Sequence, residues 1–298
     1  MNGSASSDIE SFGNNPPRTP RLCVKMSRTP LFSCVIPVKG ERPFLGEALA
    51  SLAAQGLGED LEIIVQDGGS EGGGAEDPGA GAPCRVKWFR EPDAGQSDAL
   101  NKGLARARGE WLFWLNADDV LLPGALGRVV EFVGARPAAP NWIAGDTVYI
   151  DTRGKVAEVR TDAKWRSWFG RRLSVWTGGP SAFFRRGLWG RRGGFDTDLK
   201  YAMDIDLWTR WAKAGERFAG LGAYVWGFRM HDASKTGSGR FAAEQAEELA
   251  AIDARYGVST GGFWRNLTRA ASVLDGGWIR RRCDNRRLGG RPWDALFA

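Results

Sequence analysis

The sequence predicts an α/β fold with a mostly parallel central sheet flanked by helices. Apolar runs at residues 31–38, 61–65, 85–89 and 111–115 are typical of buried strands. Residues 43–56 and 97–108 have apolar side chains at helical spacing, and a further helix is expected after Pro123. Strands that alternate with helices of this length favour parallel pairing, because each helix returns the chain to the same end of the sheet.

A different arrangement is expected after residue 140. Strands near residues 143–150, 175–184 and 218–228 are combined there with helices near 202–213 and 240–256. A chain of 298 residues is long for one compact domain and short for two large ones. We therefore expect one domain at residues 31–256, a disordered extension at 1–30 and a basic helical extension at 257–298. The first segment has no apolar run, which disfavours a signal peptide.

The formal net charge of +6 lies at the two ends of the chain. Residues 1–30 have four basic against two acidic side chains, and residues 261–298 have eight arginines against three aspartates. The residues between them have a net charge of −1, which excludes a nucleic-acid-binding domain. Four widely spaced cysteines without a CxxC pair suggest neither a zinc site nor a disulfide framework and fit a cytoplasmic location. No apolar run approaches the ~20 residues of a membrane span.

Acidic and amide side chains end the run at residues 111–115. Asn116, Asp118 and Asp119 follow it directly. Neighbouring carboxylates repel each other, which raises their pKa values unless a cation neutralises them. Mg²⁺ and Mn²⁺ prefer carboxylate oxygens and also bind phosphate, so the element predicts a divalent metal beside a diphosphate ligand. The alternative is a solvated acidic turn in which Asp119 caps the helix after Pro123.

Two turns after neighbouring strands could bind a nucleotide. Asp67 ends the second apolar run before two glycines and could accept the N3–H of a uracil or thymine ring. An Asp-Gly turn is the simpler interpretation. After the third run, Asp93, Gly95, Gln96 and the start of the next helix could bind a phosphate or ribose. Alternatively, Ser97 is simply the N-cap of that helix.

Two single residues in the second half are candidates for chemistry. Asp204 lies at the start of the helix expected near residues 202–213, beside its buried stripe. A carboxylate there could take a proton from an acceptor hydroxyl, a task worth ~10²- to 10⁴-fold in rate, or it could only favour the helix start. His231 is the single histidine and could ligate the same metal or contact the diphosphate, although a structural or surface histidine is commoner.

The motifs VIP, DGGS, DAGQSDALNKG, WLNADD, GGFD with MDIDLW, and RMH, in this order, resemble the family 2 inverting glycosyltransferases over about residues 31–256. The resemblance implies the GT-A fold, a nucleotide-sugar donor for which UDP is the family-level expectation, and Mn²⁺ or Mg²⁺. It also implies inversion at C1 and a hydroxyl acceptor in cell-surface polysaccharide or glycolipid synthesis. Together with the turn at residues 93–96, it assigns the donor site to Pro37, Glu41, Asp67, Asp93, Gly95, Gln96, Asn116 and Asp119, the metal to Asp118 and His231, and the general base to Asp204.

Three features depart from the family pattern. Asn116 replaces the usual first Asp of the DxD element, Met203 replaces the first acid of a Glu-Asp pair, and residues 38–40 replace TYN. The first two leave a catalytically idle binding or scaffold protein as an alternative. A sugar nucleotidyltransferase is another alternative, but PVKGERP only weakly resembles the basic phosphate loop that it needs. A Rossmann oxidoreductase is disfavoured because no GxGxxG follows a strand.

Two segments could contact the acceptor. Residues 164–172 contain Trp165, Trp168, Arg171 and Arg172, which could stack on a sugar ring and bind phosphate, or simply be buried. Residues 263–274 have apolar side chains on one helical face and precede three arginines, so the basic C-terminus could contact an anionic membrane with a lipid-linked acceptor. The alternative is a helix packed on the domain with a solvated basic tail.

Overall fold

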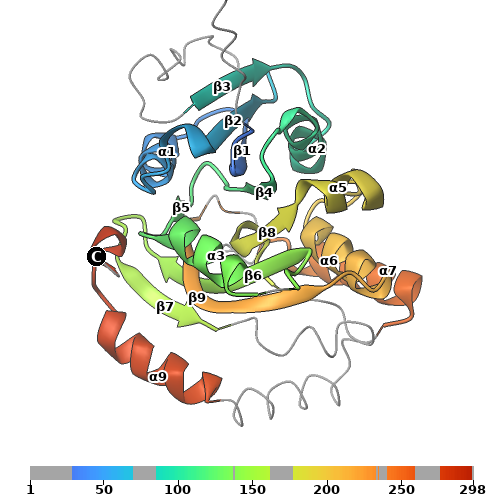
Figure 1. The fold of residues 1–298 in the computed structure, drawn as a ribbon. Coiled ribbons are helices and arrows are strands. Elements are labelled where there is room, and N and C mark those ends of the chain that lie inside the picture. Colours follow the sequence, from blue (N-terminus) through green and yellow to red (C-terminus); the bar gives the residue numbers. More distant parts are fainter. Residues whose placement is uncertain are drawn as a thin grey trace, which may run out of the picture.

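The computed structural model describes residues 29–69, 85–136, 138–161, 177–232, 234, 240–258 and 276–296. These residues form a nine-stranded sheet with helices on both faces (Figure 1). The strand order is β3-β2-β1-β4-β8-β6-β9-β5, and β7 pairs with β6. The predicted α/β class is confirmed, and the sheet is mixed.

The first half of the sheet is parallel, as the alternation of strands and helices predicted. Its strands are β1 (Phe32–Val38), β2 (Leu61–Asp67), β3 (Arg85–Arg90) and β4 (Trp111–Trp114). The helices between them are α1 (Leu45–Ala53), the short η1 (Gly58–Asp60) and α2 (Gln96–Arg106). Because the four strands run the same way, their carboxyl ends and the polar residues that follow meet at one edge.

The second half of the sheet is mostly antiparallel. It contains β8 (Ala182–Arg185), β6 (Trp142–Ile150), β9 (Phe218–Arg229), β5 (Val120–Leu121) and β7 (Val156–Arg160). Only the β6–β9 pair is parallel here, and β8 joins the two halves antiparallel to β4. The strand expected at residues 175–184 is shorter, because η3 (Gly179–Ser181) precedes β8 and residues 175 and 176 lie outside the described part.

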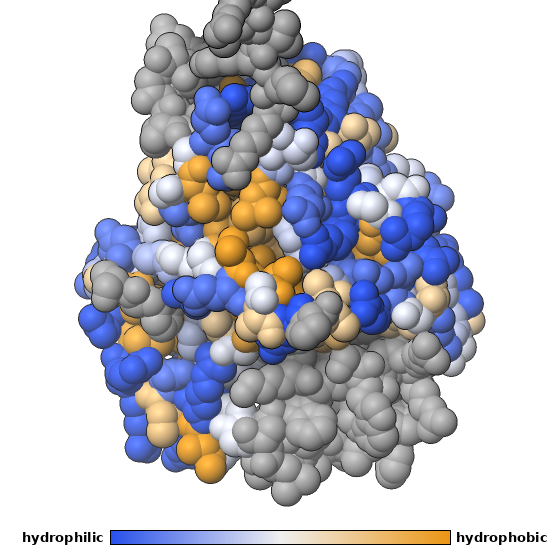
Figure 2. Space-filling model, in the orientation of Figure 1, coloured by the Kyte–Doolittle hydropathy of each residue, from blue (hydrophilic) through white to orange (hydrophobic). Residues whose placement is uncertain are grey.

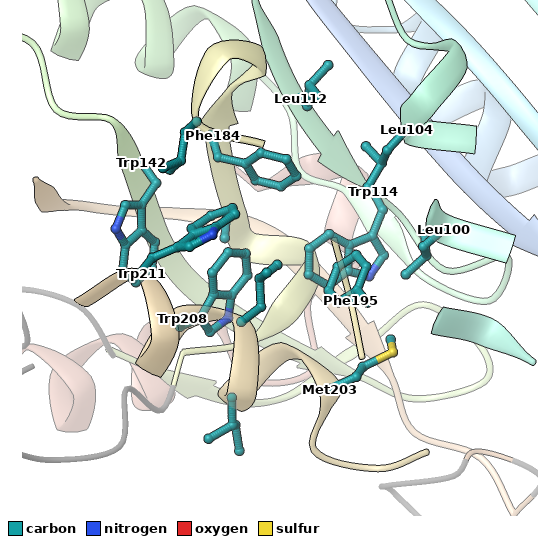
Figure 3. Packing of buried hydrophobic residues seen from close by; sticks show 14 of the residues in the cluster. Leu100, Leu104, Leu112, Trp114, Trp142, Phe184, Phe195, Met203, Trp208 and Trp211 are labelled. Atoms are coloured by element: carbon teal, nitrogen blue, oxygen red, sulfur yellow. The ribbon is translucent and has the colours of Figure 1, made fainter. Parts of the chain in front are cut away.

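Two apolar layers hold the helices on the sheet. On one face, α1 and α3 (Ala125–Gly134) cover a cluster that includes Ile36, Ile63 and Phe113. The other face is covered by α2, α5 (Arg186–Arg192), α6 (Met203–Lys213) and α7 (Ala242–Tyr256). Figure 3 shows the centre of this second layer, where the indoles of Trp142 and Trp208 stack 5.0 Å apart. The ring of Trp208 also stacks on Trp114, 5.8 Å away, which packs α6 against the end of β4.

The C-terminal segment packs on the far end of the sheet. It contains α9 (Gly277–Leu288) and η4 (Trp293–Ala295), and Leu288 and Leu296 are buried against β6, β7 and β9. The stripe expected at residues 263–274 lies outside the described residues, as do residues 1–28. Within the described part, no helix has the length and apolar character needed to cross a membrane.

Candidate functional site

The polar residues predicted from strand ends gather at the carboxyl edge of the parallel strands. Asp67 is the last residue of β2, opposite Val38 of β1, and Asn116 follows β4. The turn after β3 is packed against the turn after β2, because a Cβ on Gly68 would overlap the carboxylate of Asp93. Gly68 therefore brings the two nucleotide-binding turns predicted from the sequence into contact.

The carboxylate of Asp67 is completely buried and lies between two arginines. Its Oδ2 is 3.3 Å from both Arg42 Nη1 and Arg90 Nε, and its Oδ1 accepts the N–H of Gly69 at 3.2 Å. The guanidinium of Arg42 also lies over the ring of Trp88, 5.6 Å from its centroid. Asp67 is thus surrounded by two cationic side chains and an aromatic ring.

Two nearby carboxylates accept backbone N–H groups of the turn at residues 93–96. Asp93 Oδ1 accepts the N–H of Gly95, and Asp98 Oδ2 accepts the N–H of Ala94, both at 3.0 Å. Gly95 has a φ of 130°, which favours glycine. These two N–H groups are therefore not free for a phosphate, and the contact toward the acidic element comes from the side chain of Gln96, which donates to Asn116 at 2.9 Å.

The acidic element, formed by Asn116, Asp118 and Asp119, has one buried carboxylate, Asp119, and one accessible carboxylate, Asp118. Asp119 is fully buried, with one oxygen accepting from Asn116 at 2.7 Å and the other from the N–H of Arg229 at 2.9 Å. Burial and then the charge of Asp118 raise the pKa of Asp119 well above its usual value. Asp118 is about one third exposed, and its Oδ2 lies 2.8 Å from Nε2 of His231.

Arg229 is a buried hub beneath this element. Its Nε donates to the carbonyl of Asp118 at 2.8 Å and its Nη1 to the carbonyl of Asp151 at 3.2 Å. Its Nη2 forms an ion pair with Glu47 of α1 at 2.6 Å. The other oxygen of Glu47 accepts the indole N–H of Trp293 at 2.5 Å. The guanidinium of Arg229 therefore contacts the acidic turn, the residue after β6 and helix α1. Glu47 extends this network to Trp293 in the C-terminal segment.

Asp204 lies at the start of α6 and faces η3. Desolvation raises its pKa from 3.8 to about 6, although the N–H groups of Ile205, Asp204 itself and Gly179 partly offset this effect. Gly179 is wedged between Asp204 and the ring of Trp114, the last residue of β4. Asp204, whose pKa is raised, therefore contacts Gly179, and Gly179 contacts Trp114 at the end of β4. The acidic element follows directly after this strand.

A comparison with known protein families identifies the family to which the chain belongs. A family model described as Glycosyl transferase family 2 matches residues 33–196, which is more than half of the chain. The chain belongs to glycosyl transferase family 2. This family match includes the strand ends, both predicted nucleotide turns and the acidic element.

Curated relatives carry the same activity in their names. A PGL/p-HBAD biosynthesis glycosyltransferase from Mycobacterium bovis is 32% identical over 189 residues, which cover 60% of this chain and 68% of the relative. An uncharacterized glycosyltransferase from Rickettsia typhi is 26% identical over 257 residues, covering 83% of this chain and 75% of the relative. The protein is a glycosyltransferase.

Solved structures share the fold. The structure of S. aureus TarS 1–349 in complex with UDP-GlcNAc superposes with a TM-score of 0.56 at 19% identity, covering 75% of this chain and 65% of that chain. The mannosyltransferase PcManGT from Pyrobaculum calidifontis, in complex with GDP-Man and Mn²⁺, gives 0.54 at 23% identity, covering 76% and 64%. The predicted GT-A fold is confirmed, and the predicted family is confirmed by the family match.

Contacts join several of the predicted site residues of this glycosyltransferase. Gln96 donates to Asn116, which donates to Asp119, and Asp118 lies beside His231. Asp93 lies against Gly68, the residue after Asp67. Pro37 lies near the end of β1, and Glu41 is exposed in the loop before α1. The acceptor candidates Trp165, Trp168, Arg171 and Arg172 lie outside the described residues.

One predicted donor residue is enclosed in the structure. Asp119 was expected to line the donor sugar; its side chain is fully buried, and both of its carboxylate oxygens have partners inside the protein. Asp118 is the more exposed of the two adjacent carboxylates. The role of Asp119 at the donor sugar stays a prediction.

Sequence reasoning missed the residues that support the site. Arg229 and Glu47 lie 182 residues apart, and nothing in the sequence pairs them. The signal at Arg229 was present, because a charged residue ends a long apolar strand two positions before His231. Arg42 and Arg90 were also missed, although Arg42 directly precedes a predicted helix and Arg90 directly follows a predicted strand.

Gly179 provides a test of how tightly Asp204 is held. In Gly179→Ala the new Cβ would overlap the ring of Trp114 and lie 3.1 Å from Asp204 Oδ2. We expect a loss of about 1–3 kcal/mol of stability from overpacking, seen as a lower Tm, together with a lower kcat. Gly127→Ala in α3 is the control, since no atom lies within 4 Å of its Cβ. Wild-type Tm and kcat in Gly179→Ala would contradict the assigned contact.

Proposed function

We propose that this glycosyltransferase moves a sugar from a nucleotide-diphosphate sugar, UDP-linked, to a hydroxyl group of the acceptor with inversion at C1. The observation that carries this proposal is the position of Asp118 and His231, 2.8 Å apart, at the sheet edge to which Asp204 is also tied. Asp118 and His231 suit the binding of a metal and a diphosphate, and Asp204 suits the role of general base. One edge thus provides the two functions that sugar transfer requires.

Asp118 and His231 fit a divalent metal such as Mn²⁺ or Mg²⁺. Within the described residues, no group of three or more metal-binding side chains occurs. Two protein donors are sufficient for these ions, which usually complete their shell with water and substrate phosphates. Burial and then the charge of Asp118 raise the pKa of Asp119, and the second of these effects indicates a place where an added cation lowers the energy. When bound, the metal would neutralise charge on the leaving diphosphate.

Asp204 would accept the proton of the attacking hydroxyl. A pKa of about 6 leaves most of the carboxylate ionised at neutral pH and keeps it a better base than an exposed aspartate. No second acid adjoins it at position 203, where the sulfur of Met203 lies 2.9 Å from the hydroxyl of Ser97. A single base on one face of the sugar supports inversion by direct displacement, and a product with retained configuration at C1 would contradict this role.

The nucleotide half would bind the donor through the turns after β2 and β3. Asp67 would accept a hydrogen bond from the base, with Arg42, Arg90 and Trp88 around it. The name of the mycobacterial relative supports a place in a biosynthetic pathway, and we propose cell-surface glycolipid or polysaccharide synthesis. The alternatives of an idle scaffold and a nucleotidyltransferase are outcomes of the test below.

The test is calorimetric titration of UDP, with GDP for comparison, in Mn²⁺ and again in EDTA. We expect UDP to bind at least about tenfold more tightly in Mn²⁺ than in EDTA, and Asp118→Ala to remove this difference, because the metal couples the protein to the diphosphate. Asp232→Ala is the matched control, since it removes an exposed carboxylate next to His231. The absence of nucleotide binding in every condition would favour the idle scaffold, and release of diphosphate from a nucleoside triphosphate would favour the nucleotidyltransferase.

A further inference from the structure

The helix α9 has two chemically different sides. On the side that faces the sheet, each polar group has a partner. Arg280 pairs with the buried Asp146 at 3.0 Å and Arg281 with Glu158 at 2.5 Å. Asp284 accepts the hydroxyl of Tyr224 at 2.9 Å, and Asn285 accepts the N–H of Val159 at 2.7 Å. These contacts fix the orientation of the helix about its axis.

The outward side of α9 combines apolar and cationic groups without acidic ones. Trp278 and Ile279 are 50% and 58% exposed, and they are two of the three exposed large hydrophobic residues in the described part of the chain. Arg282 and Arg286 lie one and two turns beyond Trp278 on the same face, because residues four apart share a helix face. The guanidinium of Arg282 lies over the Trp278 ring, 5.5 Å from its centroid.

Neither of these two arginines pairs with a carboxylate among the described residues, whereas three of the other α9 cations do. Their charge is therefore available to an external anion. Figure 2 shows the surface of α9, at the lower left, as hydrophilic with hydrophobic patches set into it. An indole, a branched aliphatic side chain and two long cationic side chains on one face can together contact the headgroup region of an anionic bilayer.

We propose that the outward face of α9, formed by Trp278, Ile279, Arg282 and Arg286, binds the surface of a membrane that contains anionic phospholipids. Trp278 and Ile279 enter the region between headgroups and acyl chains, and the arginines pair with lipid phosphates. The contact is peripheral, because no described helix can span a bilayer. A nucleic acid is a poorer match, since two free cations neutralise few phosphates and the exposed aliphatic side chain gains nothing there.

The proposal is independent of the donor site, because α9 contacts β6, β7 and β9 and none of the residues assigned to the donor. It would place the sugar-transfer site at a fixed position relative to the lipid surface. An acceptor carried by a lipid would then be presented to the enzyme in two dimensions. The structure assigns this role to the described helix, in addition to the segment that the sequence suggested before it.

Co-sedimentation of the full chain with vesicles tests the proposal. The probes are vesicles of phosphatidylcholine alone and vesicles that also contain phosphatidylglycerol. We expect the protein to sediment only with the anionic vesicles, and less so as salt is added. Trp278→Ala with Ile279→Ala, and separately Arg282→Gln with Arg286→Gln, should each weaken partitioning roughly tenfold. All four side chains are exposed, so the variants should keep the wild-type Tm.

The matched control is Arg153→Gln with Arg186→Gln, which removes the same charge from exposed positions elsewhere. It should sediment like the wild type. Equal loss in this control would show a general charge effect and overturn the proposal, as would wild-type sedimentation of the α9 variants or no binding to anionic vesicles. Binding of a duplex oligonucleotide through the same arginines, without vesicle binding, would assign the face to nucleic acid. UDP titration of the same variants should be unchanged, which separates this result from the donor site.

Discussion

Asp204→Asn should reduce turnover by about 10²- to 10⁴-fold and leave UDP binding within about twofold of the wild type. The amide keeps the size of the side chain and can still accept the backbone N–H groups at the start of α6, but it cannot take a proton. The measurement is kcat with saturating donor, beside a calorimetric UDP titration of the same preparation. Asp198→Asn removes an exposed carboxylate from the loop before α6 and serves as the control. Equal turnover in both variants would exclude Asp204 as the base.

The pH dependence of the wild type follows from the same carboxylate. Because the pKa of Asp204 is raised to about 6, kcat should fall as the pH drops below 6 and the base becomes protonated. Residual activity of Asp204→Asn should lack this acidic limb. A wild-type profile that stays flat to pH 5 would show that no group with this pKa acts in turnover.

Stability should change in the opposite direction to activity. Between pH 3.8 and about 6 the folded protein keeps a proton on Asp204 that the unfolded chain has released, so this group's contribution to stability falls as the pH rises through that window. Above it, the desolvated charge costs roughly 3 kcal/mol. Asp204→Asn removes this cost, and its Tm at pH 8 should therefore exceed that of the wild type. A lower Tm would mean that the carboxylate is better solvated than its contacts indicate.

The parallel half of the fold was predictable because local pattern and global pairing agree there. The helix expected at residues 97–108 is α2 (Gln96–Arg106), and the run at residues 111–115 becomes β4 (Trp111–Trp114). β1, β2 and β3 pair in chain order, which periodicity and parallel crossovers suggest, whereas β4 returns to pair with β1, a step that periodicity alone does not define. In the second half β8 lies between β4 and β6, and such a long-range antiparallel insertion leaves no local trace in the sequence.

The contact between Asp118 and His231 was more predictable than the residues that support the candidate site. Asp118 and His231 are 113 residues apart, and only the order of motifs suggested that they belong together. The enclosure of Asp119 could not be foreseen, because adjacent aspartates look alike in a sequence and only the fold decides which one is buried. Glu47 resembles an ordinary polar position on α1 until the fold places Arg229 and Trp293 against it. Local patterns report strand ends well, whereas buried polar networks depend on tertiary contacts.

Arg229 should be the most sensitive positioning residue of the enzyme. Its guanidinium donates to the carbonyls of Asp118 and Asp151 and to the carboxylate of Glu47. Its backbone N–H donates to the carboxylate of Asp119. In Arg229→Lys the positive charge remains, but one ammonium group cannot reproduce the planar fork that reaches three acceptors. We expect a lower Tm and a loss of stability of about 3–5 kcal/mol, which is typical when a buried ion pair is broken.

The effect on function separates positioning from simple unfolding. Below the Tm of Arg229→Lys, the turn that carries Asp118 loses its anchor, so the metal-dependent affinity for UDP should fall at least about tenfold. Because Asp204 is untouched, kcat at saturating donor and Mn²⁺ should stay close to the wild type, and the change should appear in KM. Trp293→Phe is the matched partner variant, since it removes the indole N–H that Glu47 accepts and keeps an aromatic ring, and it should produce a smaller change of the same kind. If Arg229→Lys lowered the Tm but kept the wild-type UDP affinity and KM, Arg229 would stabilise the fold without orienting the acidic element.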